Sequence, residues 1–343
     1  MLKYKITDKL LKIVSDIHVQ IHKFKDKKYN SVVLAEFDFA ARSLSSFAST
    51  SIEGNPLPLT QVKQILKNTP KQKRQTEIEV LNYNETLIWL NTILKNKTNK
   101  FDSKFVLKLH QNVMHLLLPK SKSGHFRREP VFVNDPKLRK TIFWPPDHDD
   151  IEKLMSELFD FIKSNINQID PIILAGLFHK QFVIIHPFID GNGRSVRLLT
   201  KSLLAILGID TFHLFSFENF YNQNVTQYFK HVGVQGNYYD IVGKIDFTNW
   251  LEYFAEGLLD ELYRVEKELD RLQINKIAAP ELLPDQKLII EFIEKNGRIT
   301  DLQYSKITNR AKATRALDLR KLCDLGFIDK RGAGRATYYV LKK

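Results

Sequence analysis

The sequence contains a single cysteine, Cys323, among its 343 residues. One cysteine excludes an intramolecular disulfide and a cysteine-rich zinc site, and it favours a reducing compartment. Cys323 lies in the apolar stretch KLCDLGFI, a setting typical of a small core residue rather than a nucleophile. The chemistry of this protein must therefore come from other residue types.

Long apolar runs are also missing. The longest, such as the FVII stretch before His186, are far shorter than the roughly 20 residues that a membrane span needs. The N-terminal residues MLKYKITDKLLKIV lack the uninterrupted apolar core of a signal peptide. These two absences predict a cytoplasmic protein with no membrane partner.

Acidic residues are fewer than basic ones, with 39 Asp and Glu against 52 Lys and Arg and a net charge of +13. This excess indicates an anionic partner, although a basic surface also serves solubility. The hydrophobic fraction of 43% is ordinary for a globular protein with a sizeable core. The length exceeds one average domain, so we expect a large domain with a smaller one attached.

Windows that alternate between apolar and polar residues are few, which predicts a mostly α fold. Apolar residues recur at helical spacing in residues 7–22, 31–52, 60–67, 75–94, 103–118, 150–166 and 171–186. The exception is 131–145, where two strand-like pieces flank a polar turn at 134–137. We expect one β-hairpin at that place.

The C-terminal part has a different character. A helix expected over 247–275 is followed by two prolines that mark a boundary. Three expected helices and a hairpin then resemble a winged helix-turn-helix domain, and residues 284–343 carry 14 Lys and Arg against 7 Asp and Glu, a net of +7. One interpretation is DNA contact through the 310–322 helix and the 330–335 turn. Protein docking or homodimer formation is the other.

Residues 186–197 read HPFIDGNGRSVR and connect two expected helices. Glycines at 191 and 193 permit close approach of backbone N–H groups to a ligand. The helix behind this loop presents unpaired N–H donors and a positive dipole end, which together make a phosphate site. Arg194 and Arg197 lie on one face of that helix, so both guanidinium groups can reach the same polyphosphate.

Asp190 and His186 complete the constellation. A carboxylate beside an anion site requires a cation, and Mg²⁺ bridging Asp190 and phosphate oxygens is the natural interpretation. Histidine has the proton affinity that a general base for an attacking hydroxyl needs. A base, a metal carboxylate, an anion site and two arginines together indicate nucleotide-phosphate transfer, in which catalysis is mainly positioning and charge stabilisation.

The same stretch matches the signature of the Fic family, HPFx[D/E]GNGRxxR, at every defined position. The approach AGLFHKQFVII resembles the helix before that signature, and GHFRR at 124–128, with the hairpin ending in WPP, resembles the family's flap. The likeness covers roughly residues 30 to 260. It implies a Fic-type helical core with a β-hairpin flap, and a protein adenylyltransferase activity.

By this resemblance, His186 removes the proton from a Ser, Thr or Tyr hydroxyl of a protein target, itself included, and the oxygen attacks the α-phosphate of ATP. Phe188 packs into the core and Asp190 binds Mg²⁺. Arg194 binds the β-phosphate and Arg197 the γ-phosphate. The expected ATP-binding residues are Gly191, Asn192, Gly193, Arg194, Ser195, Arg197, Tyr228 and Phe229.

Tyr228 and Phe229 stand where related proteins have two tyrosines near the nucleotide base, so one phenol is missing. The flap is implied to bind an extended target segment by strand addition. Its docking residues are expected to be Val131, Phe132, Val133, Ile142 and Phe143. A ribbon that only covers the core is the structural alternative.

Residues 49–54 read STSIEG at the end of an apolar-periodic helix over about 31–53. Taken alone, Glu53 and Gly54 form a helix end, and Glu53 would be a solvated end residue. The pattern [S/T]xxxE[G/N] resembles the inhibitory helix that some Fic proteins carry before the catalytic core. That resemblance implies that Glu53 pairs with Arg197 in the space of the γ-phosphate, with Ser49 hydrogen-bonded nearby.

Other activities stay open. Fic relatives also transfer UMP or phosphocholine, and removal of AMP from a modified target is a further alternative. Transfer of the γ-phosphate, as in the Doc branch, goes with a lysine in place of Gly193. A DNA-binding regulator that only senses nucleotide has no need of His186 as a base. The expected organisation is an N-terminal helical region over 1–100, a catalytic core over 101–260, a helical linker over 261–283 and a winged-helix-like domain over 284–343.

Overall fold

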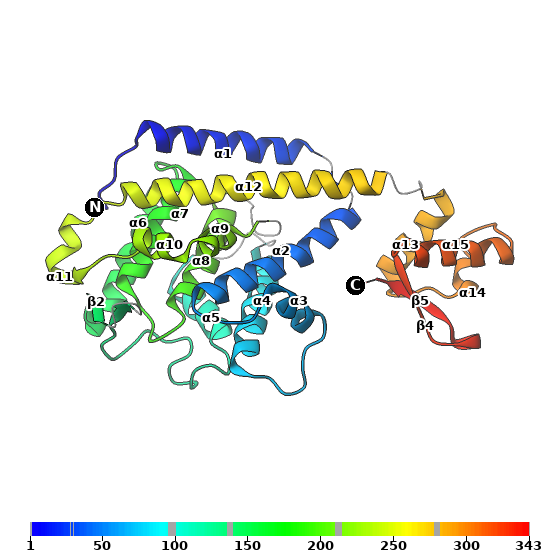
Figure 1. The fold of residues 1–343 in the computed structure, drawn as a ribbon, viewed down its shortest axis with the longest axis horizontal. Helices are drawn as coiled ribbons and strands as arrows, with labels where there is room; N and C mark the ends of the chain where they lie inside the picture. The colour runs from blue at the N-terminus through cyan, green and yellow to red at the C-terminus, as the bar shows by residue number, and fades with distance from the viewer. Residues whose placement is uncertain are drawn as a thin grey trace. The chain divides into compact units, whose positions relative to one another are not determined.

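The computed structural model describes residues 2–27, 29, 31–94, 101–135, 140–209, 215–277 and 282–342. The chain divides into two compact units, residues 1–273 and 274–343, and each is described by itself. Helices dominate both (Figure 1), which confirms the mostly α prediction. No helix within the described ranges is both long and apolar enough to cross a membrane. The finer boundaries expected from the sequence stay predictions.

The elements that begin in the first unit are, in chain order, α1 (Asp8–Asp26), α2 (Ser31–Ile52), α3 (Leu59–Lys67), α4 (Gln75–Leu94), α5 (Ser103–Val113), β1 (Val133–Asp135), β2 (Lys140–Trp144), α6 (Ile151–Asn165), α7 (Pro171–Ile185), α8 (Asn192–Ile206), α9 (Phe217–Gln223), α10 (Val225–Val232), β3 (Gly236–Asn237), α11 (Tyr238–Ile241) and α12 (Thr248–Ile277).

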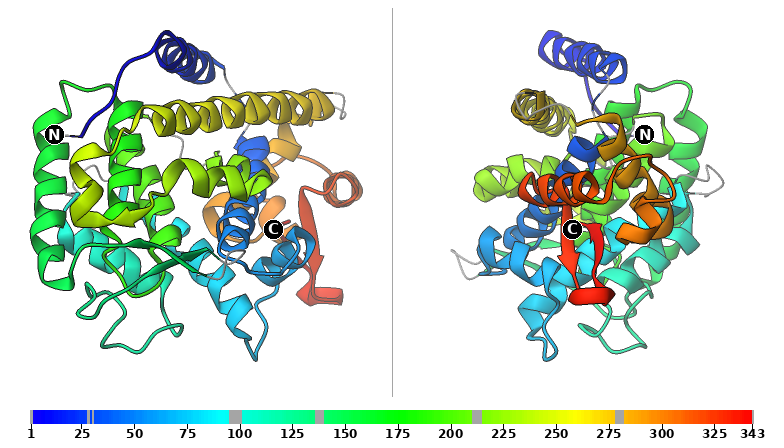
Figure 2. Two further views of the ribbon diagram at one scale, coloured as in Figure 1. Left: turned by 60° about the vertical axis from the view of Figure 1, so that its left-hand side comes forward. Right: turned by 90° about the vertical axis from the view of Figure 1, so that its right-hand side faces the viewer.

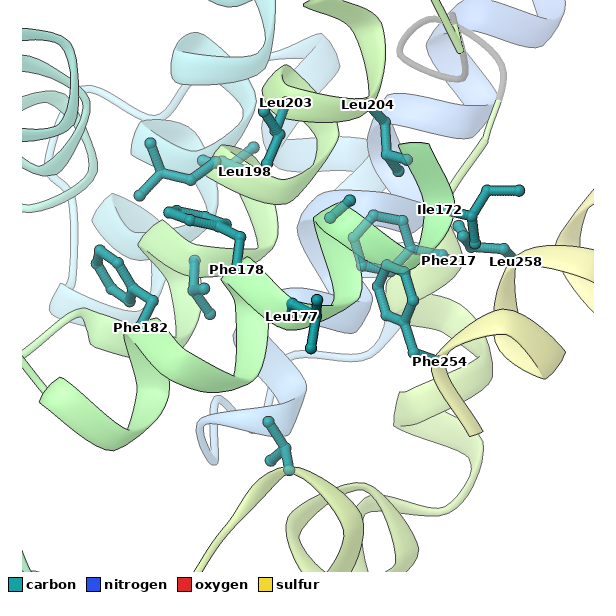
Figure 3. Packing of buried hydrophobic residues seen from close by; sticks show 14 of the residues in the cluster. Ile172, Leu177, Phe178, Phe182, Leu198, Leu203, Leu204, Phe217, Phe254 and Leu258 are labelled. Atoms are coloured by element: carbon teal, nitrogen blue, oxygen red, sulfur yellow. The ribbon is translucent and has the colours of Figure 1, made fainter. Parts of the chain in front are cut away.

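The helices α7 and α8 form the centre of the first unit. Helix α7 begins at Pro171, and the side chain of Asp170 accepts a hydrogen bond from the Ile172 N–H, so both residues favour a helix start at this point. Nearly every side chain of the two helices is buried. Figure 3 shows labelled core residues of these two helices together with one from α9 and two from α12, namely Ile172, Leu177, Phe178, Phe182, Leu198, Leu203, Leu204, Phe217, Phe254 and Leu258.

Helix α12 runs beside α1 in all three views (Figures 1 and 2). Polar contacts join them along their length, including Lys9 with Glu256 at 2.7 Å and Lys27 with Glu266 at 2.8 Å. Apolar side chains of both helices belong to the main core. Val265 and Leu269 of α12 are among these buried residues, so the part of the expected linker up to residue 272 packs with the first unit.

The expected hairpin is present, and β1 pairs antiparallel with β2. Strand β1 begins at Val133, so Val131 and Phe132 lie before the strand, which corrects the expectation that they belong to it. Phe143 is 2% exposed and packs in the core, so its side chain cannot bind a docked target. Strand β2 also pairs in parallel with β3, a strand too short to give an alternating pattern in the sequence.

Helix α5 ends at Val113 and not at 118 as expected. Leu116 adopts a φ of 61°, in the left-handed region where a leucine cannot continue an α-helix. The apolar periodicity beyond Val113 therefore belongs to a set of turns, and this segment leads toward the hairpin.

A buried ion pair joins α8 and α9 in the interior of the first unit. Lys201 of α8 and Glu218 of α9 are 1% and 0% exposed, with Nζ and Oε1 2.9 Å apart. Ser45 of α2 and Tyr83 of α4 donate hydrogen bonds to the same Glu218 oxygen, at 3.1 Å and 2.6 Å. One carboxylate thus ties α2, α4, α8 and α9 together.

The second unit contains α13 (Pro284–Asn296), α14 (Asp301–Tyr304), α15 (Lys312–Asp324), β4 (Ile328–Arg331) and β5 (Tyr338–Leu341), with the two strands antiparallel. Three helices and a hairpin follow each other as expected, and the winged-helix interpretation stays a prediction. Arg310 pairs with Asp285 and Asp318, and Arg315 with Asp301. These two arginines are therefore engaged inside the unit, which leaves fewer cations for DNA.

Replacement of Glu218 by glutamine tests the importance of the buried ion pair. The Lys201 ammonium would remain buried without a counter-charge, and breaking a buried pair in this way costs about 3–5 kcal/mol. We expect E218Q to lower the free energy of unfolding by that amount in urea denaturation followed by tryptophan fluorescence. The three tryptophans, Trp89, Trp144 and Trp250, all lie in the first unit, so the signal reports on that unit.

The matched control is Glu268→Gln. It removes the ion pair between Glu268 and Arg271, whose atoms are 2.6 Å apart on the surface of α12. The Arg271 side chain of that pair is 64% exposed, so the variant should leave the denaturation midpoint unchanged. Equal midpoints for E218Q and E268Q would contradict the argument.

Candidate active site

His186 lies at the C-terminal end of α7 with a φ of 51°, in the left-handed region. Its Nδ1 is 3.2 Å from the Val183 carbonyl oxygen, and a carbonyl only accepts, so Nδ1 carries the proton. The other nitrogen, Nε2, is then an acceptor. Burial lowers the pKa of His186 to about 4, so the ring is neutral at physiological pH. The free acceptor nitrogen suits a general base, and the lowered pKa keeps it unprotonated while making it a weaker base than an ordinary imidazole.

The loop after His186 is closed by the side chain of Asn192. Its Oδ1 accepts from the Phe188 N–H at 2.9 Å and its Nδ2 donates to the Phe188 carbonyl at 2.8 Å. Gly191 has a φ of 78°, and a Cβ there would lie 2.5 Å from the Met114 sulfur. A side chain at 191 would therefore be strained and would also collide with the α5 end. The side-chain amide of Asn192 is thus used by the loop, and its backbone N–H, at the first position of α8, has no intrahelical acceptor.

Helix α8 begins at Asn192, directly behind this loop. The Arg194 and Arg197 side chains are 6% and 0% exposed. Buried nitrogens of both guanidinium groups, Nε and Nη1 of Arg194 and Nη1 of Arg197, have no hydrogen-bond partner among the described residues, and neither has the Ser195 hydroxyl. Buried cationic donors without acceptors are costly. Oxygens of a bound phosphate would satisfy them.

Asp190 lies at the mouth of the loop, and its side chain is 58% exposed. One oxygen accepts from the Gly191 N–H at 2.5 Å, and both lie 3.3 Å from Nη2 of Arg194. Within the described ranges no three His, Cys, Asp or Glu residues gather into a metal cage. A single accessible carboxylate beside a phosphate site fits Mg²⁺, which takes one or two carboxylates, substrate phosphates and waters.

The end of α2 reaches this site. Arg197 Nη2 donates to Glu53 Oε1 at 2.8 Å, and Arg197 Nε donates to Ser49 Oγ at 2.7 Å. The contacts expected of Ser49 and Glu53 are thus present. A Cβ built on Gly193 would collide with the same Glu53 carboxylate. Glu53 therefore lies directly against the glycine loop and is bonded to Arg197, the arginine to which the family resemblance gives the γ-phosphate.

Comparisons with known proteins bear on this arrangement. A family model described as "Fic/DOC family" matches residues 100–204. The chain carries a Fic domain.

Relatives of the Fic domain include proteins named "Protein adenylyltransferase Fic". That of Nematostella vectensis is 32% identical over 166 residues, which make up 47% of this chain and 37% of that protein. That of Drosophila erecta is 33% identical over 166 residues, 47% of this chain and 32% of that protein. The chain thus spans only about a third of the length of these relatives.

Solved structures share the fold. A Fic family protein from Desulfovibrio desulfuricans G20 superposes with a TM-score of 0.67 at 19% identity, over 99% of this chain and 98% of that one. Fic-1 from C. elegans gives a TM-score of 0.60 at 20% identity, over 76% of this chain and 73% of that one. The similarity to the first structure extends beyond the Fic domain to nearly the whole chain.

The two aromatic residues expected near the nucleotide base, Tyr228 and Phe229, lie in different surroundings. Tyr228 is 1% exposed, stacks on Tyr221 and has its hydroxyl 3.1 Å from His179 Nε2. Phe229 is 50% exposed. Tyr228 is therefore part of the core and closed to a base in this conformation, whereas the Phe229 ring is accessible.

His110 of α5, which no motif in the sequence indicated, supports the loop at 186–191. The ring is buried and lies parallel to that of Phe188, with centroids 3.6 Å apart. Its Nδ1 accepts from the Gly124 N–H at 2.9 Å, so Nε2 carries the proton and donates to the Asp190 carbonyl at 3.0 Å. Burial lowers its pKa to about 4, which keeps the ring neutral. His110 thus fixes the backbone of the carboxylate that is expected to hold Mg²⁺.

His110→Phe tests this support. Phenylalanine retains a ring against Phe188, but the Asp190 carbonyl and the Gly124 N–H both lose their partners. We expect a loss of about 1–3 kcal/mol for each buried group left unpaired, measured by urea denaturation. His115→Phe is the control, because the His115 side chain is exposed. The same stability for both variants would show that the two hydrogen bonds contribute nothing.

Proposed function

We propose that this protein transfers AMP from ATP to a Ser, Thr or Tyr hydroxyl of a protein, itself included, and that Glu53 holds the site inactive. The observation that carries the proposal is the set of buried guanidinium nitrogens of Arg194 and Arg197 at the start of α8 that have no hydrogen-bond partner among the described residues. Glu79 Oε1 lies 3.8 Å from Arg194 Nη1, beyond hydrogen-bond distance. The helix that carries the two arginines follows a loop that begins at His186, whose Nε2 is an acceptor. The printed names of the relatives support the same reaction.

In this reaction Nε2 of His186 accepts the hydroxyl proton of the target. The oxygen forms a bond to the α-phosphorus while the bond from that phosphorus to the bridging oxygen of the β-phosphate breaks, and pyrophosphate leaves. Arg194 and the loop N–H groups bind the phosphates, and Asp190 would hold Mg²⁺, which supplies charge neutralisation on the phosphate oxygens. The chain contributes position and positive charge, and a proton acceptor.

Glu53 blocks this arrangement by charge and by space. While Arg197 Nη2 is bonded to the Glu53 carboxylate, that donor is not available to a γ-phosphate. The carboxylate also lies against Gly193, where its negative charge repels phosphate. Helix α2 must shift, or Glu53 must be removed, before ATP can bind with its α-phosphate in line for attack.

The target segment is proposed to add to the free side of β1. Strand β2 already pairs with β1 on one side and β3 on the other, so it has little edge to offer. Val133 lies on β1, and Phe132, which is 55% exposed, lies directly before it. Ile142 lies on β2 and is half-buried. Main-chain hydrogen bonds along β1 would give affinity, and the exposed Phe132 would contact the target.

Location in the cytoplasm, DNA contact through 284–343 and a homodimer remain predictions from the sequence.

The central test uses Glu53→Gly incubated with ATP and Mg²⁺ and analysed by intact mass spectrometry. We expect one or more added AMP units in E53G, a much smaller gain in the parent, and none in the double variant E53G/H186A. Glu85→Ala is the matched control, because Glu85 is an exposed acid on α4, away from Arg197.

If E53G gains no mass, the assay is repeated with cell lysate and with labelled ATP, UTP and CTP. Transfer from UTP or CTP alone would replace AMP with another nucleotide. No transfer from any of the three would reject a nucleotidyltransferase and leave the nucleotide-sensing regulator.

The pH dependence of transfer tests the role of His186. Its pKa is lowered to about 4, and the base must be neutral, so activity is present above that value and is lost as the pH falls through it. We expect the rate of E53G to stay nearly constant from about pH 8 to about pH 5.5. Loss of half the activity near pH 6.5, the ordinary value for histidine, would contradict the structure.

A further inference from the structure

Arg127 connects the flap to the catalytic histidine. Its side chain is 5% exposed, and Nε donates to the carbonyl of His186 at 2.8 Å. Nη2 donates to the Pro146 carbonyl at 2.5 Å and Nη1 to the Glu129 carbonyl at 3.3 Å. The three acceptors are main-chain oxygens of three separate chain segments.

The acceptors lie at both ends of the flap and at the catalytic histidine. Glu129 precedes the hairpin formed by β1 and β2, and Pro146 follows it, so Arg127 joins the two ends of the flap. The third acceptor belongs to His186 itself, and the backbone N–H of Arg127 donates to the next carbonyl, that of Pro187, at 2.9 Å. Arg127 therefore holds the flap and the base in one hydrogen-bonded unit.

The buried positive charge of Arg127 indicates a role beyond filling space in the core. Among the ion pairs of the described residues none includes Arg127, and all the hydrogen bonds of its guanidinium go to main-chain carbonyls. The Asp147 carboxylate contributes only a charge interaction without direct contact. Burial of this charge is costly, and an apolar side chain would fill the same volume at lower cost. What only a guanidinium provides is a planar group that donates to several acceptors in fixed directions.

We propose that Arg127 is a positioning residue, which sets the distance and angle between a target segment docked on the flap and Nε2 of His186. The proposal rests on the proposed function, since it concerns how the target hydroxyl meets the base. It requires nothing of the ATP phosphates, whose binding groups lie on α8 and in the glycine loop. Loss of Arg127 therefore affects transfer to the target and spares nucleotide binding.

The test compares Arg127→Met and Arg127→Lys with Arg128→Met, all in the full chain carrying Glu53→Gly. Arg128 is the matched control, because it is the neighbouring arginine and is exposed. Three quantities are measured: the Kd for ATP with Mg²⁺ by calorimetry, hydrogen–deuterium exchange of peptides covering 129–146 and 186–191, and the rate of AMP transfer.

For R127M we expect a Kd within about two-fold of the E53G parent and faster exchange in both peptides. Transfer should fall about 100-fold, the effect of a misplacement of roughly 1 Å. R127K, which retains one donor direction, should fall between R127M and the parent in both exchange and rate. R128M should match the parent in all three measurements.

Unchanged exchange in R127M, or faster exchange in only one of the two peptides, would overturn the proposal, because the flap and the base would not be joined. A loss of transfer matched by an equal loss of ATP affinity would overturn it as well. If R127M does not fold, R127K decides by the same criteria. Failure of the E53G parent to transfer any nucleotide sinks the proposed function instead, and the exchange result still decides whether Arg127 joins flap and base.

Discussion

The burial of Arg197 is the constraint on which the active site depends. A guanidinium with no exposed surface must have acceptors close by, and in this structure they are Ser49 and Glu53 at the end of α2. A phosphate can take the place of Glu53, because it carries negative charge and acceptor oxygens as a carboxylate does. The same side chain therefore explains both why α2 packs against α8 and why the site is suited to a nucleotide.

Around this pair, the loop is held mainly through its backbone. His110 donates to the carbonyl of Asp190, Arg127 donates to that of His186, and Asn192 bonds both backbone groups of Phe188. The side chains bond locally as well: Nδ1 of His186 donates to Val183, and Asp190 accepts from Gly191 and Arg194. Nε2 of His186 stays available for a proton, and the Asp190 carboxylate stays exposed for a cation.

The glycine loop and most of the helices could be predicted from the sequence, because their signals lie in contiguous residues. The motif at 186–197 is contiguous, and the helices follow from apolar periodicity. The Glu53 contact came from a family pattern and not from physical reasoning, since two residues so far apart in sequence give no shared signal. Strand β3 is too short to alternate, and the burial of Phe143 and Tyr228 depends on packing between elements. His110 and Arg127 donate to main-chain carbonyls. Every residue has such a carbonyl, so the type of the accepting residue gives no sign of these hydrogen bonds in the sequence.

Since Glu53 belongs to the same chain as Arg197, it acts as a tethered ligand. Its occupancy is set by an effective concentration, on the order of millimolar or above for short connections, and does not change when the protein is diluted. Ser45, on the same helix, is bonded to the buried Glu218, so the tether is stiff. A free anion that competes for Arg197 must therefore overcome local geometry as well as affinity. A small change in the packing of α2 would therefore change how often Glu53 is bound to Arg197. A small change in the concentration of a dissolved anion would have less effect.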